Sequence, residues 1–326
     1  MRVLVWHVHG AWTTAFVQGP FDVVVPVVPD RGPRGRGRPD TYAWPEAVRE
    51  VASDRVRDED VDVVVLQRPD DARLLREWTG LEPGRDVPAV YVEHNTPPGP
   101  IALARHPVAD RSDIPLVHVT SFNRLMWDAG HAPTVVIEHG IPDPGERWTG
   151  ELPRAGVVVN EPIRRARVTG ADLVPVIASA APVDAFGIGT EDLTRPAPAG
   201  RGSLPPFEVV GHGDVAHDAM LDELARRRVY VHLCRWTSLG LSLLEAMHLG
   251  MPVVSLATTE VPEALAGSGV VMSNDPDRLA ALVRVFVHDR DAAAAAGAQV
   301  RTAARERYSL ARFHADWERL LKEVTA

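Results

Sequence analysis

The stretch from Cys234 to Leu241, CRWTSLGL, has the residue types of an anion-binding turn. A short β-branched run ends just before it, and Thr237 or Ser238 can cap a helix that starts there. The first amides of a helix have no partner within it, so they point toward whatever lies beyond the strand. The groups expected to bind a phosphate in this way are the backbone N–H groups of Ser238, Leu239, Gly240 and Leu241.

Glu245 follows Ser238 by seven residues, which is nearly two turns of a helix. Its carboxylate is therefore expected on almost the same face as the anion site. A carboxylate placed there is suited to accept hydrogen bonds from the hydroxyl groups of a ribose. A plain surface glutamate is the weaker reading, because its neighbours are the apolar residues expected to be buried: Leu243, Leu244, Ala246 and Met247.

Two strand ends in the first half of the chain carry a Glu-His pair. One is Glu93-His94 and the other is Glu138-His139. Hydrogen bonds within a turn would account for either pair alone. Ligands of open parallel sheets bind beyond the carboxyl ends of the strands, so two such pairs in one half favour a polar cleft.

His7 and His9 lie two residues apart on an expected strand and so share one face. A metal site could start from such a pair, but no third ligand stands at a characteristic spacing, and we predict no metal. Gly10 follows them and would allow close approach of the backbone to a ligand. Cys234 is the single cysteine, so an internal disulfide and a site of several thiolates are excluded.

A glycine loop raises a dinucleotide enzyme as an alternative. Gly211-His212-Gly213 follows an expected strand and precedes a helical pattern, and Ala216 completes a G-x-G-x-x-A fingerprint. The loop lies deep in the second half, however, and Arg235 stands near the place where an acidic ribose ligand is expected. An NADP-dependent oxidoreductase is therefore a weaker hypothesis.

The composition is that of a folded protein with two domains. The chain has 326 residues, 45% of them hydrophobic and 24% charged. Its net charge of -9 disfavours nucleic acid and anionic membranes as partners. No signal peptide or membrane-spanning run is expected, and we predict a cytoplasmic protein. The arginine-rich segment Pro29–Pro39 reads as a surface loop; an alternative is a flap that contacts an anionic substrate or a lipid head group at the inner membrane face.

Short β-branched runs alternate with helical patterns, which predicts an α/β protein with parallel sheets. A polar, turn-rich stretch divides two doubly wound halves, residues 1–147 and 148–326. The last helix, near Leu310–Val324, is expected to pack on something at the end of the chain, with the first domain as one candidate. The expected strands are Val3–Val5, Val23–Val28, Val61–Leu66, Ala89–Val92, Leu116–Thr120, Val135–Glu138, Gly156–Val159, Val174–Ile177, Phe207–Val210, Val229–Leu233, Pro252–Leu256 and Gly269–Met272.

At this point the sequence resembles the retaining GT-B glycosyltransferases that carry an E-x7-E signature. The matching residues are Leu239-Gly240-Leu241, Glu245-Ala246-Met247, Gly250 and Pro252-Val253-Val254. The segment Thr258–Glu263 is similar to the one that closes over the sugar in this family. The resemblance implies a GT-B fold, in which two Rossmann-like domains face a central cleft and the second domain binds the donor.

The resemblance also assigns roles to single residues. Arg164 matches the arginine that holds the donor diphosphate, but Thr169 stands where the family has a lysine, so Arg165 or Arg167 would supply that charge. His212 and Gly213 fall where the backbone of the family meets the nucleobase. Thr237 replaces the first glutamate of the signature, which contacts the donor sugar, whereas Glu245 keeps the ribose contact.

The function implied is transfer of a sugar from a nucleotide-diphosphate donor to a small-molecule, glycan or lipid-linked acceptor, with retention and without a metal or another cofactor. His94, Arg164 and Thr237 are the expected catalytic residues, and Gly10 would let the acceptor or the phosphate approach. Further alternatives are another GT-B enzyme, such as an inverting heptosyltransferase or a sugar-nucleotide epimerase, and a catalytically silent sugar-nucleotide-binding protein, which Thr237 and Thr169 would suit.

Overall fold

The computed structural model describes residues 1–194 and 208–326. Contacts within the chain define two compact units. The first comprises Met1–Gly140 together with Leu310–Ala326, and the second comprises Ile141–Ser309. The division falls after Gly140 instead of after residue 147, and the last helix, α11 (Leu310–Thr325), groups with the first unit.

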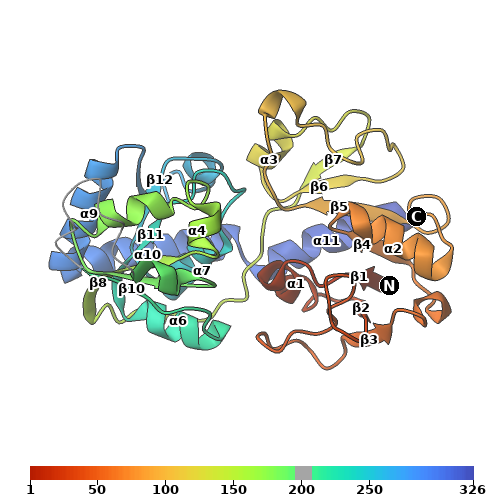
Figure 1. The fold of residues 1–326 in the computed structure, drawn as a ribbon, viewed down its shortest axis with the longest axis horizontal. Helices are drawn as coiled ribbons and strands as arrows, with labels where there is room; N and C mark the ends of the chain where they lie inside the picture. The colour runs from red at the N-terminus through yellow and green to blue at the C-terminus, as the bar shows by residue number, and fades with distance from the viewer. Residues whose placement is uncertain (195–207) are drawn as a thin grey trace. The chain divides into compact units, whose positions relative to one another are not determined.

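In the part of the chain that the structure describes, the first unit has a sheet of seven parallel strands in the order β3-β2-β1-β4-β5-β6-β7 (Figure 1). The central strands β1 and β4 are buried on both faces, which explains their unbroken valine-rich runs. The strands are β1 (Arg2–Val5), β2 (Asp22–Val27), β3 (Arg49–Ala52), β4 (Val63–Leu66), β5 (Ala89–Glu93), β6 (Leu116–His118) and β7 (Thr134–Val136).

Helices cover the two faces of this sheet. The helix α2 (Pro69–Thr79) buries Leu74, Leu75 and Trp78 in one core cluster with the sheet. On α1 (Gly10–Phe16), the ring of Trp12 meets Trp317 of α11 edge to face, with ring centroids 5.6 Å apart. The aromatic residues of α1 and α11 therefore tie the two ends of the chain into one unit. The unit also contains α3 (Ser121–Met126) and two 3-10 turns, Val56–Asp58 and Ile101–Leu103.

The second unit has, among its described residues, a sheet of six parallel strands in the order β10-β9-β8-β11-β12-β13. They are β8 (Leu152–Val158), β9 (Val183–Phe186), β10 (Val209–Gly211), β11 (Arg227–His232), β12 (Val253–Leu256) and β13 (Val271–Ser273). Its helices are α4 (Pro162–Arg165), α5 (Val174–Ile177), α6 (His217–Ala225), α7 (Leu241–Leu249), α8 (Val261–Ala264), α9 (Pro276–His288) and α10 (Arg290–Arg307), with 3-10 turns at Ala171–Leu173 and Thr190–Thr194.

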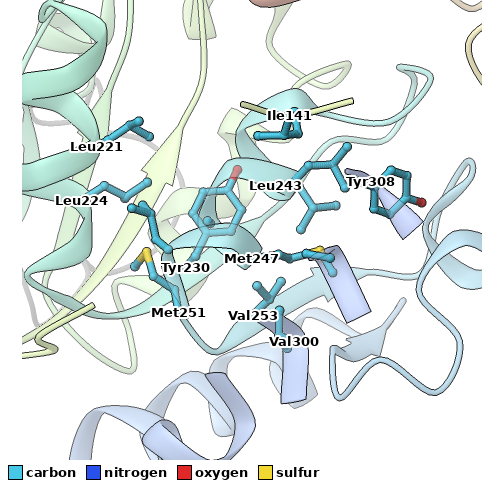
Figure 2. Packing of buried hydrophobic residues seen from close by; sticks show 14 of the residues in the cluster. Ile141, Leu221, Leu224, Tyr230, Leu243, Met247, Met251, Val253, Val300 and Tyr308 are labelled. Atoms are coloured by element: carbon cyan, nitrogen blue, oxygen red, sulfur yellow. The ribbon is translucent and has the colours of Figure 1, made fainter. Parts of the chain in front are cut away.

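Two apolar clusters flank this sheet. Figure 2 shows one of them, in which Tyr230 of β11 lies among side chains from α6 and α7, such as Leu224 and Met247, with Val300 of α10 nearby. The other joins α5 and α9 to the same strands. Burial on both faces of the sheet makes this unit a three-layer α/β structure, as the sequence predicts.

One of the expected strands is wrong, and one observed strand was not expected. Val174–Ile177 was predicted to be a strand but forms the helix α5, and the strand of that region is β9. Periodicity does not separate a four-residue apolar helix from a buried strand, and Pro175 in the first turn favours the helix. The strand β3 was missed. The strand expected at Phe207–Val210 begins outside the described residues, and β10 covers Val209–Gly211.

The alanine run before Gly297 lies in the first half of α10 (Arg290–Arg307). A Cβ atom at Gly297 would collide with the carbonyl group of Gly250, the residue that ends α7 with φ +82°. The glycine therefore permits α10 to approach the end of α7 closely.

A buried ionic cluster anchors β8, β9 and β11 to one another. Asp184 of β9 is only 2% exposed and accepts hydrogen bonds from Arg154 (2.7 Å), Arg227 (2.8 Å) and His212 (3.1 Å). Burial by itself would raise the pKa of Asp184, but the guanidinium groups and His212 hold it below its usual range. The carboxylate is therefore ionised, and it neutralises two arginines at the sheet.

Replacing Asp184 with Ala is expected to lower the free energy of unfolding by about 3–5 kcal/mol, because it leaves a buried cation without this partner. Urea unfolding followed by circular dichroism measures the change. The matched control is Asp222→Ala, which removes a 67%-exposed partner of Arg147 and should cost about 1 kcal/mol or less. Equal losses in both variants would contradict the assignment.

Candidate functional site

The start of α7 differs in detail from the expectation. The helix begins at Leu241, and its N-cap is Gly240, with no side chain capping it. Thr237 and Ser238 therefore do not cap the helix, and the amides of Leu241 and Ser242 head it. Ser238 and Leu239 lie buried in the turn before it.

Glycine is required at position 240 by a histidine beneath it. A Cβ atom there would lie 2.5 Å from Cε1 of His232, the last residue of β11. Burial lowers the pKa of His232 to about 4, so its ring is neutral at physiological pH. Tyr230, also on β11, has its hydroxyl group 3.0 Å from that of Ser242 in the first turn of α7. The end of β11 thus fixes where α7 begins.

Glu245 is 7% exposed on α7 and has a partner that sequence reasoning missed. Its Oε1 accepts a hydrogen bond of 2.8 Å from Nε2 of His217, the first residue of α6. Burial alone would lower the pKa of His217, but the bond to Glu245 and the nearby charges of Glu245 and Asp218 raise it above its ordinary value. No spacing signal could reveal this pair, since it arises where two helices pack.

The expected diphosphate loop does meet the β11–α7 segment. The carbonyl group of Val168 accepts hydrogen bonds from the amides of Arg235 (2.9 Å) and Trp236 (3.3 Å). Gly170, with φ +77°, lies so close to the Leu233 carbonyl group that no side chain fits there. The structure therefore brings the arginine loop and the turn before α7 together, as the resemblance implies.

The three arginines of the loop have different surroundings. Arg164 forms an ion pair with Glu161 (Nε to Oε1, 2.8 Å), and Arg167 forms one with Asp172 (3.1 Å). In the described ranges, 1–194 and 208–326, Arg165 forms no ion pair with a carboxylate; its charge acts on Glu161 and on the thiol of Cys234. Of the three, Arg165 is the one whose charge remains for a ligand beside the turn before α7.

The two threonines that replace family residues are both turned inward. Thr169 is 4% exposed and donates a hydrogen bond to the carbonyl group of Ala166 (3.1 Å), so it offers nothing in place of the lysine. Oγ1 of Thr237 is buried, and the group that faces it is the thiol of Cys234, a weak hydrogen-bonding partner. Burial raises the pKa of neighbouring Cys234 to about 11, so that group is a neutral thiol and a poor nucleophile.

The loop expected at the nucleobase is largely occupied by internal bonds. The His212 ring stacks on Phe186, with centroids 4.6 Å apart, and its amide donates to the Ala185 carbonyl group (2.8 Å). The Gly213 amide donates to Oγ1 of Thr190 (3.0 Å). Few of the polar groups of His212 and Gly213 are therefore available to a nucleobase.

His94 lies in the first unit, directly after β5, and is 8% exposed. Its ring centroid is 4.0 Å from that of His9 and 5.0 Å from that of Trp12. Gly10 is covered by Tyr42, whose ring would meet a Cβ atom there at 2.8 Å. The described residues include no set of three or more His, Cys, Asp or Glu side chains that could hold a metal ion.

Residues 208–303 match the sequence model of a family described as "Glycosyl transferases group 1". This range holds His217, Thr237 and Glu245, together with the helix α7. No curated protein sequence matches the chain. A search of the described helices finds none with the length and apolar character that crossing a bilayer demands.

Solved structures resemble the chain at low sequence identity. The HepE protein of Anabaena, in complex with UDP and glucose, has a TM-score of 0.70 and 14% identity over 99% of this chain and 100% of that one. Sucrose-phosphate synthase from Thermosynechococcus elongatus has a TM-score of 0.68 and 13% identity over 99% of both chains. The fold is GT-B. TarM has a TM-score of 0.61 and 15% identity over 79% of this chain, which spans 54% of TarM.

The predicted GT-B fold is thus confirmed: each unit is a Rossmann-like domain built on a parallel sheet. The match of residues 208–303 to the group 1 family model, together with the GT-B fold, supports a glycosyltransferase.

The pair His217–Glu245 should make stability depend on pH. Because the pKa of His217 is higher in the folded protein than in the unfolded chain, its contribution is complete below about pH 6.5 and is lost as the pH rises through the folded value. His217→Leu is expected to cost about 1.5–3 kcal/mol at pH 6 and less at pH 9. Thermal unfolding across this range measures the difference.

The control for that experiment is His288→Leu, which removes an exposed histidine at the end of α9. Its cost should be small and nearly the same at every pH. A cost of His217→Leu that stays constant from pH 6 to pH 9 would contradict a role for the charged pair.

Proposed function

We propose that this protein transfers a sugar from a nucleoside diphosphate donor, bound by the second unit, to a hydroxyl group of an acceptor. The observation that carries the proposal is the docking of residues 164–170 onto the end of β11, beside the start of α7. It brings the arginine-bearing loop to the strand end that leads into α7, the helix that carries Glu245, in a domain whose fold is that of glycosyltransferases.

The donor diphosphate needs positive charge as its bond to the sugar breaks. The amides of Leu241 and Ser242 and the positive end of the α7 dipole would bind it from one side. Arg165 would bind it from the loop, and Arg164 would join once a phosphate competes with Glu161 for its guanidinium group. Fixed groups of this kind stabilise a developing charge without reorganising during the reaction.

Glu245 would accept hydrogen bonds from the ribose hydroxyl groups, as the resemblance implies. Oγ1 of Thr237, which faces only the weakly hydrogen-bonding thiol of Cys234 among the described residues, would bond to a hydroxyl group of the donor sugar, because a buried hydroxyl without a strong partner costs free energy that a ligand can recover. A neutral threonine in place of a glutamate suits a sugar with a different pattern of hydroxyl groups.

Retention and independence of metal are part of the proposal. The acceptor hydroxyl would attack from the face of the leaving diphosphate, and a phosphate oxygen would take its proton. This route needs no nucleophile from the protein, and the neutral thiol of Cys234 supplies none. The acceptor belongs to the small-molecule, glycan or lipid-linked classes, and we place the reaction in the cytoplasm, with attachment to the inner membrane face as an alternative.

A catalytically silent nucleotide-sugar-binding protein is the second candidate. The inward-facing Thr169, bonded to the Ala166 carbonyl group, leaves the diphosphate loop without its lysine. Binding of a donor without turnover on any acceptor would favour this candidate. An NADP-dependent oxidoreductase is less well supported, because Arg235 is paired with Asp172 and does not stand free for a 2′-phosphate.

Glu245→Ala should remove most of the thermal stabilisation that a bound donor provides. Since HepE is seen with UDP and glucose, UDP-glucose and UDP are the first ligands to test, followed by a panel of other nucleotide sugars. A ligand at a hundred times its dissociation constant adds about 2.7 kcal/mol to the stability of the native state. Glu306→Ala, on the exposed side of α10, is the control and should keep the full shift.

The same shift in Glu245→Ala as in the unchanged protein would take Glu245 out of the site. Absence of any shift across the whole panel of nucleotide sugars would overturn the proposed function.

Arg165→Ala should weaken binding of UDP more than Arg167→Ala does. Arg165 forms no ion pair with a carboxylate in the described structure, whereas Arg167 is 76% exposed and already paired with Asp172. A lost hydrogen bond between charged groups is worth about 1.5–3 kcal/mol, or roughly 10- to 150-fold in the dissociation constant, and calorimetric titration measures it. A larger effect of Arg167→Ala would reverse this assignment.

A further inference from the structure

We propose that Gln67 is a positioning residue: it sets the hydrogen on Nε2 of His94 and leaves Nδ1 of that ring to accept a hydrogen bond from a substrate hydroxyl group. Gln67 directly follows β4, and His94 directly follows β5. The two strands are parallel neighbours, so both side chains stand at the carboxyl edge of the sheet. The substrate part of this proposal rests on the proposed function.

The orientation of the Gln67 side chain follows from its first partner. Nε2 of Gln67 lies 2.6 Å from the backbone carbonyl oxygen of Trp6. A carbonyl oxygen only accepts hydrogen bonds, so the NH2 group of the amide must face it. Two further features hold the side chain in place. Gln67 is only 5% exposed, and its backbone N–H group donates a hydrogen bond to Oδ2 of Asp71 (2.9 Å).

The tautomer of His94 follows from that orientation. With its NH2 group committed to Trp6, Gln67 presents Oε1 to Nε2 of His94 at 3.0 Å. An amide oxygen is an acceptor only, so Nε2 of His94 carries the hydrogen. In a neutral ring the lone pair then lies on Nδ1.

The surroundings keep the ring neutral. Burial, followed by the proximity of His9 and His139, lowers the pKa of His94 well below its ordinary value. The charged groups that act on this cluster are all cationic, so a further proton would be repelled. They are Arg36 and Arg68 at His9, and Arg312 at His139.

A neighbouring histidine ring has a buried polar atom that lacks a hydrogen-bond partner. Nδ1 of His139 is buried without a hydrogen bond in the described residues. Buried polar groups are usually paired, so an orphan atom beside His94 points to a polar ligand. Neutral rings of this kind match hydroxyl groups better than cations. The cluster therefore assigns the substrate hydroxyl group the role of donor and His94 the role of acceptor.

Nitrogen NMR of 15N-histidine-labelled full-length protein tests the tautomer without any ligand. In the unchanged protein at pH 7, His94 should show the hydrogen on Nε2. Gln67→Leu should increase the population with the hydrogen on Nδ1, and it should lower kcat/KM about tenfold or more. An Nδ1–H ring or an imidazolium in the unchanged protein would overturn the proposal, and so would an unaltered ring in Gln67→Leu.

Gln67→Glu separates positioning from a merely structural role. A carboxylate still accepts from Nε2 of His94, but its charge favours the imidazolium, which has no lone pair on Nδ1. The acidic limb of the pH–activity profile should therefore move to higher pH in this variant. Gln18→Leu is the matched control, because Gln18 donates to the backbone carbonyl oxygen of Thr14 (2.9 Å) in the same unit. It should leave the ring and the pH profile unchanged.

The tautomer experiment and the donor-binding experiment test the two proposals independently. If nucleotide sugars bind but His94 does not respond to Gln67, the positioning role is wrong and the proposed function stands. If His94 responds to Gln67 but no nucleotide sugar binds, the proposed function is wrong, and with it the substrate assigned to Nδ1. An unmoved pH profile in Gln67→Glu would also overturn the positioning role.

Discussion

The candidate donor site depends on how the chain leaves β11. The backbone amides of Arg235 and Trp236 both donate hydrogen bonds to the carbonyl oxygen of Val168, and Gly170 lies against the carbonyl group of Leu233. This contact holds the arginine loop at the end of the strand. Without it, the arginines and the start of α7 would be two unrelated polar surface segments.

The same region shows how a fold divides its charges between structure and ligand. Asp172 forms ion pairs with Arg235 and Arg167, and Glu161 forms one with Arg164. Of the four arginines in this short loop and the turn beside it, Arg165 is thus left without an ion pair to a carboxylate among the described residues. Local ion pairs keep a cationic site ordered when its anion is absent, at the cost that the ligand must compete for the paired groups.

The fold was largely readable from patterns. Buried parallel strands appear as short valine-rich runs because both of their faces are covered, and the expected runs that form β11 and β12 show this clearly. The strand predicted at Val174–Ile177 is wrong because a run of four apolar residues shows no helical or strand periodicity. The half-exposed strand β3 was missed because its sequence lacks the apolar run of a buried strand. The helix that carries Glu245 could be predicted from its spacing, but Ser238 lies before the start of α7, so the helical face expected to join Ser238 and Glu245 is not formed.

The sequence by itself determined the class of fold, the position of α7 and the identity of the residues that depart from the family, Thr237 and Thr169. Those features are local, because the spacing of apolar and polar residues within one helix or strand is enough to indicate them. Only the tertiary structure decided the partners: His217 for Glu245, Gln67 for His94, and the carboxylates that occupy Arg164 and Arg167. Most of these contacts join different elements. All of them depend on how side chains pack and on the directions of their hydrogen bonds, which the residue type alone does not specify.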